Sequence, residues 1–304
     1  MNNITNYRNP LVLGYLSALI AAILFGSVST VAKPLVGSVS PLLLASLVYL
    51  VSSATLTPFA WKQKFPSTKK GYLLIVVIAV SGAVIAPSLY FFGLIHATAS
   101  DAAVMVNGEV FFSVLLALVF FKERLRLHGY VAAFLILVGI FIVTTDLDFS
   151  TFTLQQIHYQ DALIIVATLF WAVDNNLSRI LAQKADVAKI AQIKSAIGGI
   201  ILLVIAVFVF GNTFNINASQ VGPILLLGVT GFAASLYFFL QSLKRIGTVK
   251  TILVFSTSTI FGLIFASIFL QEQISMYQMA ATAIIIFGIY LLNRNETTAN
   301  QIRN

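Results

Sequence analysis

The sequence predicts an all-α, polytopic membrane protein whose ten transmembrane helices form two inverted five-helix repeats. Apolar residues make up 59% of the 304 residues and charged residues only 9%, whereas soluble domains carry roughly 25% charged residues. The word Ser-Leu-Tyr-Phe-Phe occurs at 88–92 and again at 235–239, an offset close to half the chain. A duplicated membrane half is typical of transporters, because rocking one repeat against the other produces alternating access.

Ten apolar stretches are close to or above the length of roughly 20 residues that a spanning helix needs. They are residues 11–33, 41–61, 71–96, 99–121, 129–146, 161–184, 187–210, 220–246, 249–270 and 276–293. The longest connection, 147–160, is polar and marks the joint between two domains of five helices each, residues 1–150 and 151–304. Because five is an odd number, the second domain is expected to be inverted, with the substrate site near the midplane between the halves.

Basic residues set the predicted orientation. With the N-terminus in the cytoplasm, 16 of the 18 basic residues fall in cytoplasmic segments, and the mid-chain outer loop has none. The C-terminus then also lies in the cytoplasm, and the expected location is the cytoplasmic membrane. This asymmetry accounts for the net charge of +8 without a nucleic acid partner. The expected partners are the lipid bilayer and a small-molecule substrate.

Several classes of function are excluded or disfavoured. The chain has no cysteine, which excludes disulfides and thiolate metal sites. His96, His128 and His158 lie at loop edges without ligand-like spacing, so no metal or other cofactor is expected. The sequence has no glycine-rich loop ending in Gly-Lys-Ser/Thr, which disfavours transport driven directly by a nucleotide. The acids near the midplane match no protease motif, so an enzyme is not expected.

Several segments together resemble the drug/metabolite transporter superfamily, and within it the proteins built from two EamA domains. The segments are the opening Ala18–Gly26 with its weaker echo Ala167–Trp171, the run Ala99–Ala103 followed by Asn107–Phe111, and the ends Lys122–Leu125 and Gln271–Ile274. The resemblance covers roughly residues 11–293. It implies a ten-helix transporter, usually an exporter of amino acids or related metabolites.

The sequence departs from the family pattern at a proline expected in the middle of two helices. Val110 stands at this position in the first half and Thr259 in the second. Without the proline, the helices expected at 99–121 and 249–270 are predicted to be less broken than in the family.

Two carboxyl groups are expected near the membrane midplane. Glu109 lies 10 residues from the outer end of its helix, and Asp174 lies 13 residues into its own. An ionisable group at this depth is costly and marks a functional site by default, and such a group can take up and release a proton. The alternative is a hydrogen-bonded carboxyl that ties two helices together. Because the two acids come from opposite halves, they suit one shared cavity.

The residues around Asp174 extend this candidate site. Asn175 and Asn176 follow it, and Trp171 precedes it by one helical turn on the same face. Three successive polar side chains cannot all face lipid, so part of this helix is expected to line water or protein. Trp171 is too deep for an interfacial belt and is a candidate aromatic wall. The alternative is an interhelical hydrogen-bond clamp.

Other candidates come from the repeat pattern. Tyr90 and Tyr237 are the tyrosines of the repeated word, with core packing as the alternative. The run Ser256–Thr259 aligns with Asn107–Val110 when both are counted back from Glu272 and Glu123. Asn107, Ser256 and Ser258 are therefore candidate substrate ligands, although serine also bonds its own helix backbone.

Four further residues lie at special positions. Lys33, at the outer end of its helix, either attracts a substrate carboxylate or extends its ammonium to the interface. Lys194 is expected to extend toward the cytoplasmic interface. Pro87 is expected to kink its helix and favours bending there during gating, since the counterpart in the second half is Ala234. Glu272, like Glu123, is expected to have a structural role at a helix end.

The leading hypothesis is a secondary transporter that exports small polar metabolites such as amino acids by alternating access, with proton exchange through the midplane acids. One alternative is an uncoupled facilitator of the same fold. Another is a flippase for lipid-linked sugars, and a third is an intramembrane enzyme. Small residues on the helices permit close packing within one chain or in a homodimer, and the sequence does not choose between them.

Overall fold

The computed structural model describes residues 10–65, 68–120, 127–145 and 159–302, and its regular elements there are all helices. The first half contains α1 (Pro10–Val36), α2 (Pro41–Ala60), α3 (Lys69–Ala79), the π-helical segment η1 (Val80–Ile85), α4 (Ala86–Leu94), α5 (Ala99–Met105), α6 (Gly108–Phe120) and α7 (Leu127–Thr145). Glu123 and the predicted domain joint at residue 150 lie outside the described residues.

The second half repeats this order of elements with one additional π-helical segment, η3. It contains α8 (Tyr159–Ala182), α9 (Val187–Val204), the π-helical segment η3 (Ile205–Val209), α10 (Ala218–Leu226), the π-helical segment η4 (Leu227–Ala234), α11 (Ser235–Ile246), α12 (Thr248–Phe255), α13 (Ser258–Phe269) and α14 (Met276–Ile302).

The helices have the length and composition of membrane spans. Within the described residues, seven helices are long and apolar enough to cross a membrane. Two shorter apolar helices cover Tyr130–Val143 and Met276–Leu291. The remaining expected span, 99–121, is divided into α5 and α6. These findings confirm the prediction of an all-α, polytopic membrane protein, while the count of ten spans stays a prediction.

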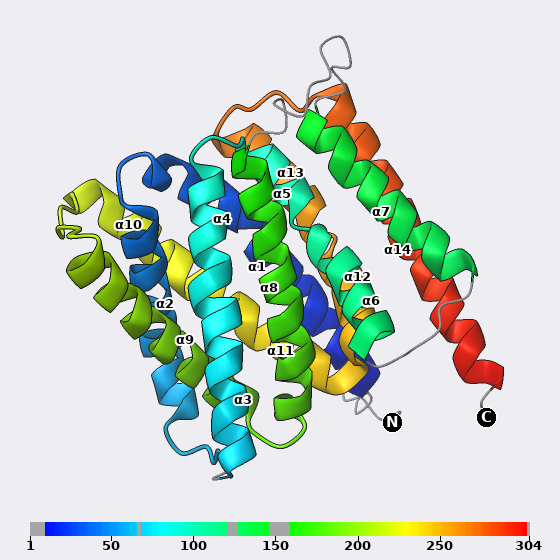
Figure 1. Ribbon diagram of the computed structural model, residues 1–304, viewed down its shortest axis with the longest axis horizontal. Coiled ribbons are helices and arrows are strands. Elements are labelled where there is room, and N and C mark those ends of the chain that lie inside the picture. The colour runs from blue at the N-terminus through cyan, green and yellow to red at the C-terminus, as the bar shows by residue number, and fades with distance from the viewer. Residues whose placement is uncertain (1–9, 66–67, 121–126, 146–158, 303–304) are drawn as a thin grey trace, which may run out of the picture.

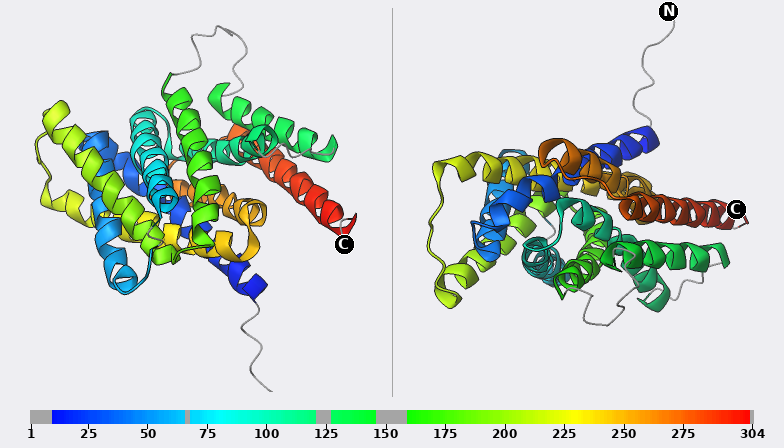
Figure 2. Two further views of the ribbon diagram at one scale, coloured as in Figure 1. Left: turned by 60° about the horizontal axis from the view of Figure 1, so that its bottom comes forward. Right: turned by 90° about the horizontal axis from the view of Figure 1, so that it is seen from above.

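Helices of one half pack mainly on helices of the other, in pairs that correspond between the halves. α2 packs on α9, and α7 on α14. Figure 1 shows α7 and α14 side by side at one edge of the molecule, with α2, α9 and α10 at the opposite edge, and Figure 2 shows the same separation from two other sides. In the centre, α1 contacts α11 and α13, just as α8 contacts α4 and α6. Side chains of both halves therefore line the middle of the bundle.

The helices expected at 99–121 and 249–270 are both broken although the proline is missing, and whether they are less broken than in the family stays a prediction. Between α5 and α6, the amide of Asn107 donates to the carbonyl of Val104 at 3.1 Å, and between α12 and α13 that of Thr257 donates to Val254 at 3.1 Å. These bonds to the third preceding residue form a tight 3₁₀ turn at each break.

Polar side chains take the place of the missing proline at these breaks. The amide group of Asn107 donates to the Val104 carbonyl at 3.0 Å, and the hydroxyl of Ser256 donates to the Leu253 carbonyl at 2.8 Å. The Asn107 amide also donates to the Thr259 hydroxyl at 2.5 Å, which joins the two breaks. These partners inside the protein help to stabilise the turns in an apolar medium.

The helix that carries Pro87 is distorted, but so is its counterpart without this proline. In both halves a π-helical segment interrupts the span, at η1 and at η4. The amide of Ala86 donates to the carbonyl of Ser81, and that of Ser235 donates to Thr230, which are bonds to the fifth preceding residue. Pro87 is therefore not the sole cause of an irregular helix at this position. Its proposed part in gating stays a prediction.

Glycine allows close approach between the halves, and this gives a test of the packing. A Cβ atom added to Gly198 of α9 would lie 2.7 Å from the carbonyl oxygen of Ala83 in η1. We expect Gly198→Ala to lower the free energy of unfolding by about 1–3 kcal/mol, the usual cost of overpacking. The measurement is the midpoint of denaturant-induced unfolding in mixed micelles.

Gly222→Ala in α10 is the matched control, because its Cβ would meet nothing within 4 Å. Alanine is the better helix former, so this variant should be equal to the wild type or more stable. Equal midpoints for Gly198→Ala and the wild type would contradict the close packing of α9 on η1.

Candidate functional site

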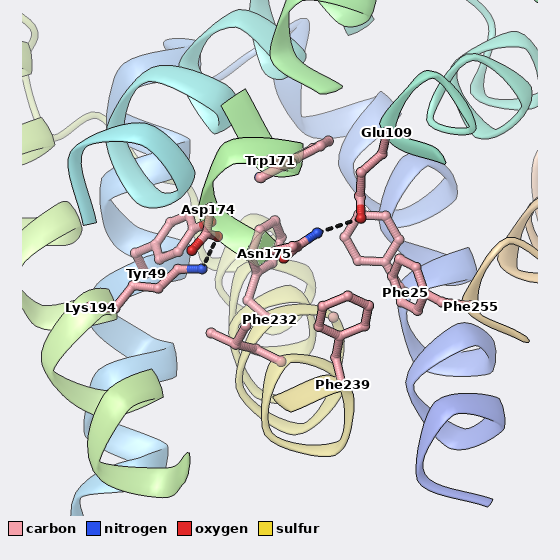
Figure 3. A pocket seen from close by; sticks show the side chains of 12 residues that line it. Phe25, Tyr49, Glu109, Trp171, Asp174, Asn175, Lys194, Phe232, Phe239 and Phe255 are labelled. Carbon is pink, nitrogen blue, oxygen red and sulfur yellow. Dashed lines mark hydrogen bonds and ion pairs between the residues drawn. The ribbon is translucent and has the colours of Figure 1, made fainter. Parts of the chain in front are cut away.

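A cavity lies where the two halves meet. Figure 3 shows its lining. The lining residues are Phe25, Tyr49, Glu109, Trp171, Asp174, Asn175, Lys194, Gly231, Phe232, Leu236, Phe239 and Phe255. The lining of a small-molecule site is typically mostly apolar, with a few polar groups that orient the ligand. The cavity fits this description.

An ion pair forms one polar side of the cavity. The ammonium of Lys194 on α9 contacts Oδ2 of Asp174 on α8, and the two side chains are 3% and 2% exposed. The hydroxyl of Ser178, one turn further along α8, donates to Oδ1 of Asp174 at 2.9 Å. Both carboxylate oxygens of Asp174 are therefore bonded within the protein.

Glu109 lies opposite this ion pair and is tied to it through Asn175. The side-chain amide of Asn175 donates to Oε1 of Glu109, and Figure 3 shows Asn175 between Glu109 and the Asp174–Lys194 pair. Glu109 stands in the first turn of α6, directly after the 3₁₀ turn. The helix break thus sets the position at which this carboxyl enters the cavity.

One face of α8 supplies three lining residues, Trp171, Asp174 and Asn175. Trp171, Asp174, Asn175 and Ser178 lie three, four and seven residues apart, the spacing that places side chains on the same side of a helix. Asn176 lies outside this set, and its side-chain amide donates to the carbonyl of Ala172 at 2.8 Å. Of the two neighbouring asparagines, the cavity therefore uses Asn175.

Aromatic rings form the rest of the wall. The ring centroid of Phe25 lies 5.9 Å from Trp171 and 5.2 Å from Phe255. Phe239 extends this contact, 4.7 Å from Phe255. On the other side, Tyr49 and Phe232 are 5.0 Å apart. These rings give the cavity a large apolar surface beside its charged groups.

A second, smaller space shares Phe25 with the main cavity. Tyr90 and Ser258 line this second space together with Ser29. The ring of Tyr90 packs against Trp171 with 5.3 Å between centroids. These two predicted site residues are therefore separated from the charged groups by the aromatic wall.

Three other predicted residues lie outside both linings. Asn107 and Ser256 bond backbone carbonyls at the helix breaks. The hydroxyl of Tyr237 accepts a hydrogen bond from the Gln241 side chain at 3.0 Å. These contacts match the alternative interpretation of each residue as a structural group.

Lys33 and Glu272 act together at the connection between α4 and α5. The ammonium of Lys33 donates to the carbonyls of Leu94, Ile95 and Ala97, at 3.0, 2.9 and 2.7 Å. Glu272 accepts from the amides of Ala99 and Ser100, both at 3.0 Å. The two charges thus cap the end of one helix and the start of the next, as favoured by the helix dipole. Lys33 lies outside the linings of both cavities.

The expectation that Lys194 extends toward the cytoplasmic interface is wrong. Lys194 is 2% exposed and pairs with Asp174 in the cavity. A signal was present in the sequence, because two buried acids need a buried cation and the stretch 187–210 carries a lysine well inside its apolar run. Sequence reasoning also missed Tyr49, Phe232, Phe239 and Phe255, which look like ordinary core residues without the fold.

Comparison with known proteins agrees with this architecture. The model of the EamA-like transporter family matches the chain twice, at residues 12–145 and 159–294. The chain belongs to the EamA-like transporter family. An uncharacterized transporter of Methanothermobacter thermautotrophicus is 30% identical over 297 residues, which cover 93% of this chain and 86% of that protein. An uncharacterized transporter of Archaeoglobus fulgidus is 26% identical, covering 86% of this chain and 89% of its own.

More distant similarities extend to Bacillus subtilis and to a solved structure. The uncharacterized transporter YyaM of Bacillus subtilis is 21% identical and covers 90% of this chain and 92% of its own. A crystal structure of another protein superposes with a TM-score of 0.67, covers 91% of this chain and 95% of its own, and is 16% identical. This similarity shows a shared fold. As a member of the EamA-like family, the chain is a multi-pass membrane transporter.

The buried ion pair predicts a specific pattern of stabilities. Lys194→Met leaves the Asp174 carboxylate without its cation, and Asp174→Asn leaves a buried ammonium without its anion. Each single variant is expected to lose about 3–5 kcal/mol of unfolding free energy, because an unpaired buried charge is costly. The double variant has neither charge and should be more stable than either single variant.

The measurement is a double-mutant cycle on unfolding midpoints in mixed micelles. Asp186→Asn is the matched control for an acid-to-amide change, since Asp186 caps α9 with its side chain and asparagine caps equally well. If the costs of the two single variants simply add in the double variant, the ion pair does not couple α8 to α9.

Proposed function

We propose that this protein is a secondary transporter that exports a small polar metabolite, such as an amino acid, across the cytoplasmic membrane in exchange for protons. The observation that carries this proposal is the group of three ionisable side chains, Glu109, Asp174 and Lys194, in one buried cavity between the halves. Ionisable residues at membrane depth lie along substrate or proton pathways by default.

The chemistry of the cavity suits an amino acid. Lys194 offers a cation for a carboxylate, and Glu109 and Asp174 offer acceptors for an ammonium group. The aromatic wall around Phe25 offers apolar surface for a side chain. A zwitterion with an apolar or aromatic side chain thus finds a partner for each of its parts.

The charge balance of the cavity supports proton coupling. One lysine and two carboxyl groups are neutral together when one proton is bound, and carry a net negative charge when both carboxyls are ionised. A net charge in a medium of low dielectric constant is costly, so the empty cavity favours the state with one proton. A substrate whose ammonium group binds to Glu109 favours release of that proton, which links the two movements.

The arrangement of the halves supports alternating access. Corresponding helix pairs cross between the halves, and the spans that contribute Glu109 and Phe255 to the cavity are both broken by 3₁₀ turns. Broken helices at a repeat interface are the usual place for a substrate site in secondary transporters. In this proposal both termini lie in the cytoplasm, and the connection held by Lys33 and Glu272 is on the outer side.

The experiment is transport by the purified protein in proteoliposomes with a panel of labelled amino acids and an internal pH dye. We expect saturable flux of some member, accompanied by proton movement. Glu109→Gln should abolish the proton movement, because an amide cannot exchange a proton, and should lower the coupled flux at least tenfold. Asp186→Asn, outside the cavity, should transport like the wild type.

Other results select other functions. Saturable flux without proton movement, unchanged in Glu109→Gln, would indicate an uncoupled facilitator. No flux across the whole panel would contradict the amino acid proposal and favour other cargo, including lipid-linked sugars, which the same vesicles can test with a labelled polyprenyl-linked sugar.

A further inference from the structure

The carbonyl oxygen of Gly82 holds two of the cavity's aromatic residues. The hydroxyl of Tyr49 on α2 donates to it at 2.8 Å, and the indole Nε1–H of Trp171 on α8 donates to it at 3.3 Å. Gly82 belongs to the π-helical segment η1, and both donors line the cavity. One backbone carbonyl thus joins three helical elements at the cavity wall.

A carbonyl inside a helix normally accepts from a backbone amide, and Gly82 has lost both of its regular donors. The amide four residues later, on Ala86, donates to the carbonyl of Ser81 instead. The donor expected in a π-helix is five residues later, at Pro87, and proline has no amide hydrogen. The carbonyl of Gly82 is therefore released by Pro87.

A buried carbonyl without a partner would be costly in the membrane interior. A carbonyl oxygen has two lone pairs and accepts two hydrogen bonds, which Tyr49 and Trp171 supply. Gly82 has a second effect, because a Cβ atom at this residue would collide with the carboxylate of Asp174. The same residue therefore fixes two aromatic rings and leaves room for the acid of the ion pair.

The other half of the protein lacks this arrangement in its sequence. The residue that corresponds to Pro87 through the repeated word is Ala234, which retains its amide hydrogen. The π-helical segment is present in both halves, so the distortion itself does not require Pro87. Pro87 adds the released carbonyl, in the half where this carbonyl binds two side chains that line the cavity.

We propose that Pro87 is a positioning residue of the cavity: by releasing the carbonyl of Gly82, it fixes Tyr49 and Trp171 in the orientation in which they line the site. Its effect on transport rests on the proposed function of the cavity as the substrate site. Its effect on the two side chains does not.

The first test is spectroscopic and needs no substrate. The chain has two tryptophans, and Trp61, at the end of α2, is 76% exposed, so Trp61→Phe leaves Trp171 as the single reporter. In Pro87→Ala the new amide competes for the carbonyl, and the longer bond, from Trp171, should be lost. We expect the hydrogen-bond-sensitive indole N–H band in ultraviolet resonance Raman spectra to shift to that of an unbonded indole. An unchanged band would overturn the proposal.

Two further variants make this test independent of any folding defect. Pro223→Ala is the matched control, since it removes another helix-internal proline, in α10, whose side chain is outside the cavity lining, and should leave the band unchanged. Tyr49→Phe keeps both the ring and Pro87, and leaves the carbonyl to Trp171 alone. It should move the band toward a stronger hydrogen bond, and a shift in the other direction, or none, would overturn the proposal.

The second test is transport in proteoliposomes with the substrate found for the wild type. In Pro87→Ala we expect KM to rise on the order of fivefold, since one net hydrogen bond is worth about that factor, with kcat nearly unchanged. Tyr49→Phe should cause a similar rise, and the double variant should be no worse than the single ones, because both act through one carbonyl.

The two proposals fail in different ways. A wild type that transports nothing, with the Raman shift present in Pro87→Ala, would contradict the proposed function and leave the positioning role of Pro87 intact. A wild type that transports normally, with additive effects of Pro87→Ala and Tyr49→Phe on KM, would overturn the positioning role and leave the proposed function intact.

Discussion

A polar group inside a membrane protein has to find its partner within the protein, and this constraint shapes the whole bundle. Apolar surface alone gives a helix little preference for one neighbour over another, because lipid chains are as apolar as leucine. The polar contacts determine which helices pack together. Asp174 joins α8 to α9 through Lys194, and Asn175 joins the second half to Glu109 of the first. The groups that define the cavity therefore also specify how the two halves meet.

The same constraint explains why the irregular parts of the helices occur where they do. A 3₁₀ turn or a π-helical segment releases carbonyls, and each release has to be matched by a donor from another residue. Thr259 supplies a donor to the Ala103 carbonyl at the first break, Ser256 supplies one at the second, and Tyr49 with Trp171 supplies them at Gly82. Irregular backbone is tolerated at membrane depth where protein surrounds it. In this protein these irregular helix segments lie around the cavity.

Length and polarity were sufficient to predict the apolar spans and the most deeply placed acids. The apolar spans and the rarity of acids within them both follow from the free-energy cost of placing each residue in the membrane. Glu109, Asp174, Asn175 and Trp171 were recognisable for this reason, and the structure brings them into one cavity. The location of Lys194 depends on how α9 is rotated against α8, which hydropathy alone does not determine. The helix breaks were expected to be weaker without a proline, whereas Asn107 and Ser256 stabilise them through side-chain hydrogen bonds. A ring such as Phe239 has the same local sequence signal whether it packs in the core or lines a cavity.

Duplication and divergence make separate contributions to this protein. The features that the halves share belong to the helix framework. The repeated sequence Ser-Leu-Tyr-Phe-Phe, the π-helical segments and the helix breaks at Asn107 and Thr257 occur in both halves. The chemical features occur in one half only. Glu109 aligns with Ser258, and Pro87 with Ala234, so the carboxyl and the released carbonyl have no copy in the other half. In the proposed alternating-access cycle, the shared framework would allow two conformations of similar energy, in which each half takes the place of the other. The asymmetric cavity would then give a ligand different contacts in the two conformations, and a ligand shifts an equilibrium only through such a difference.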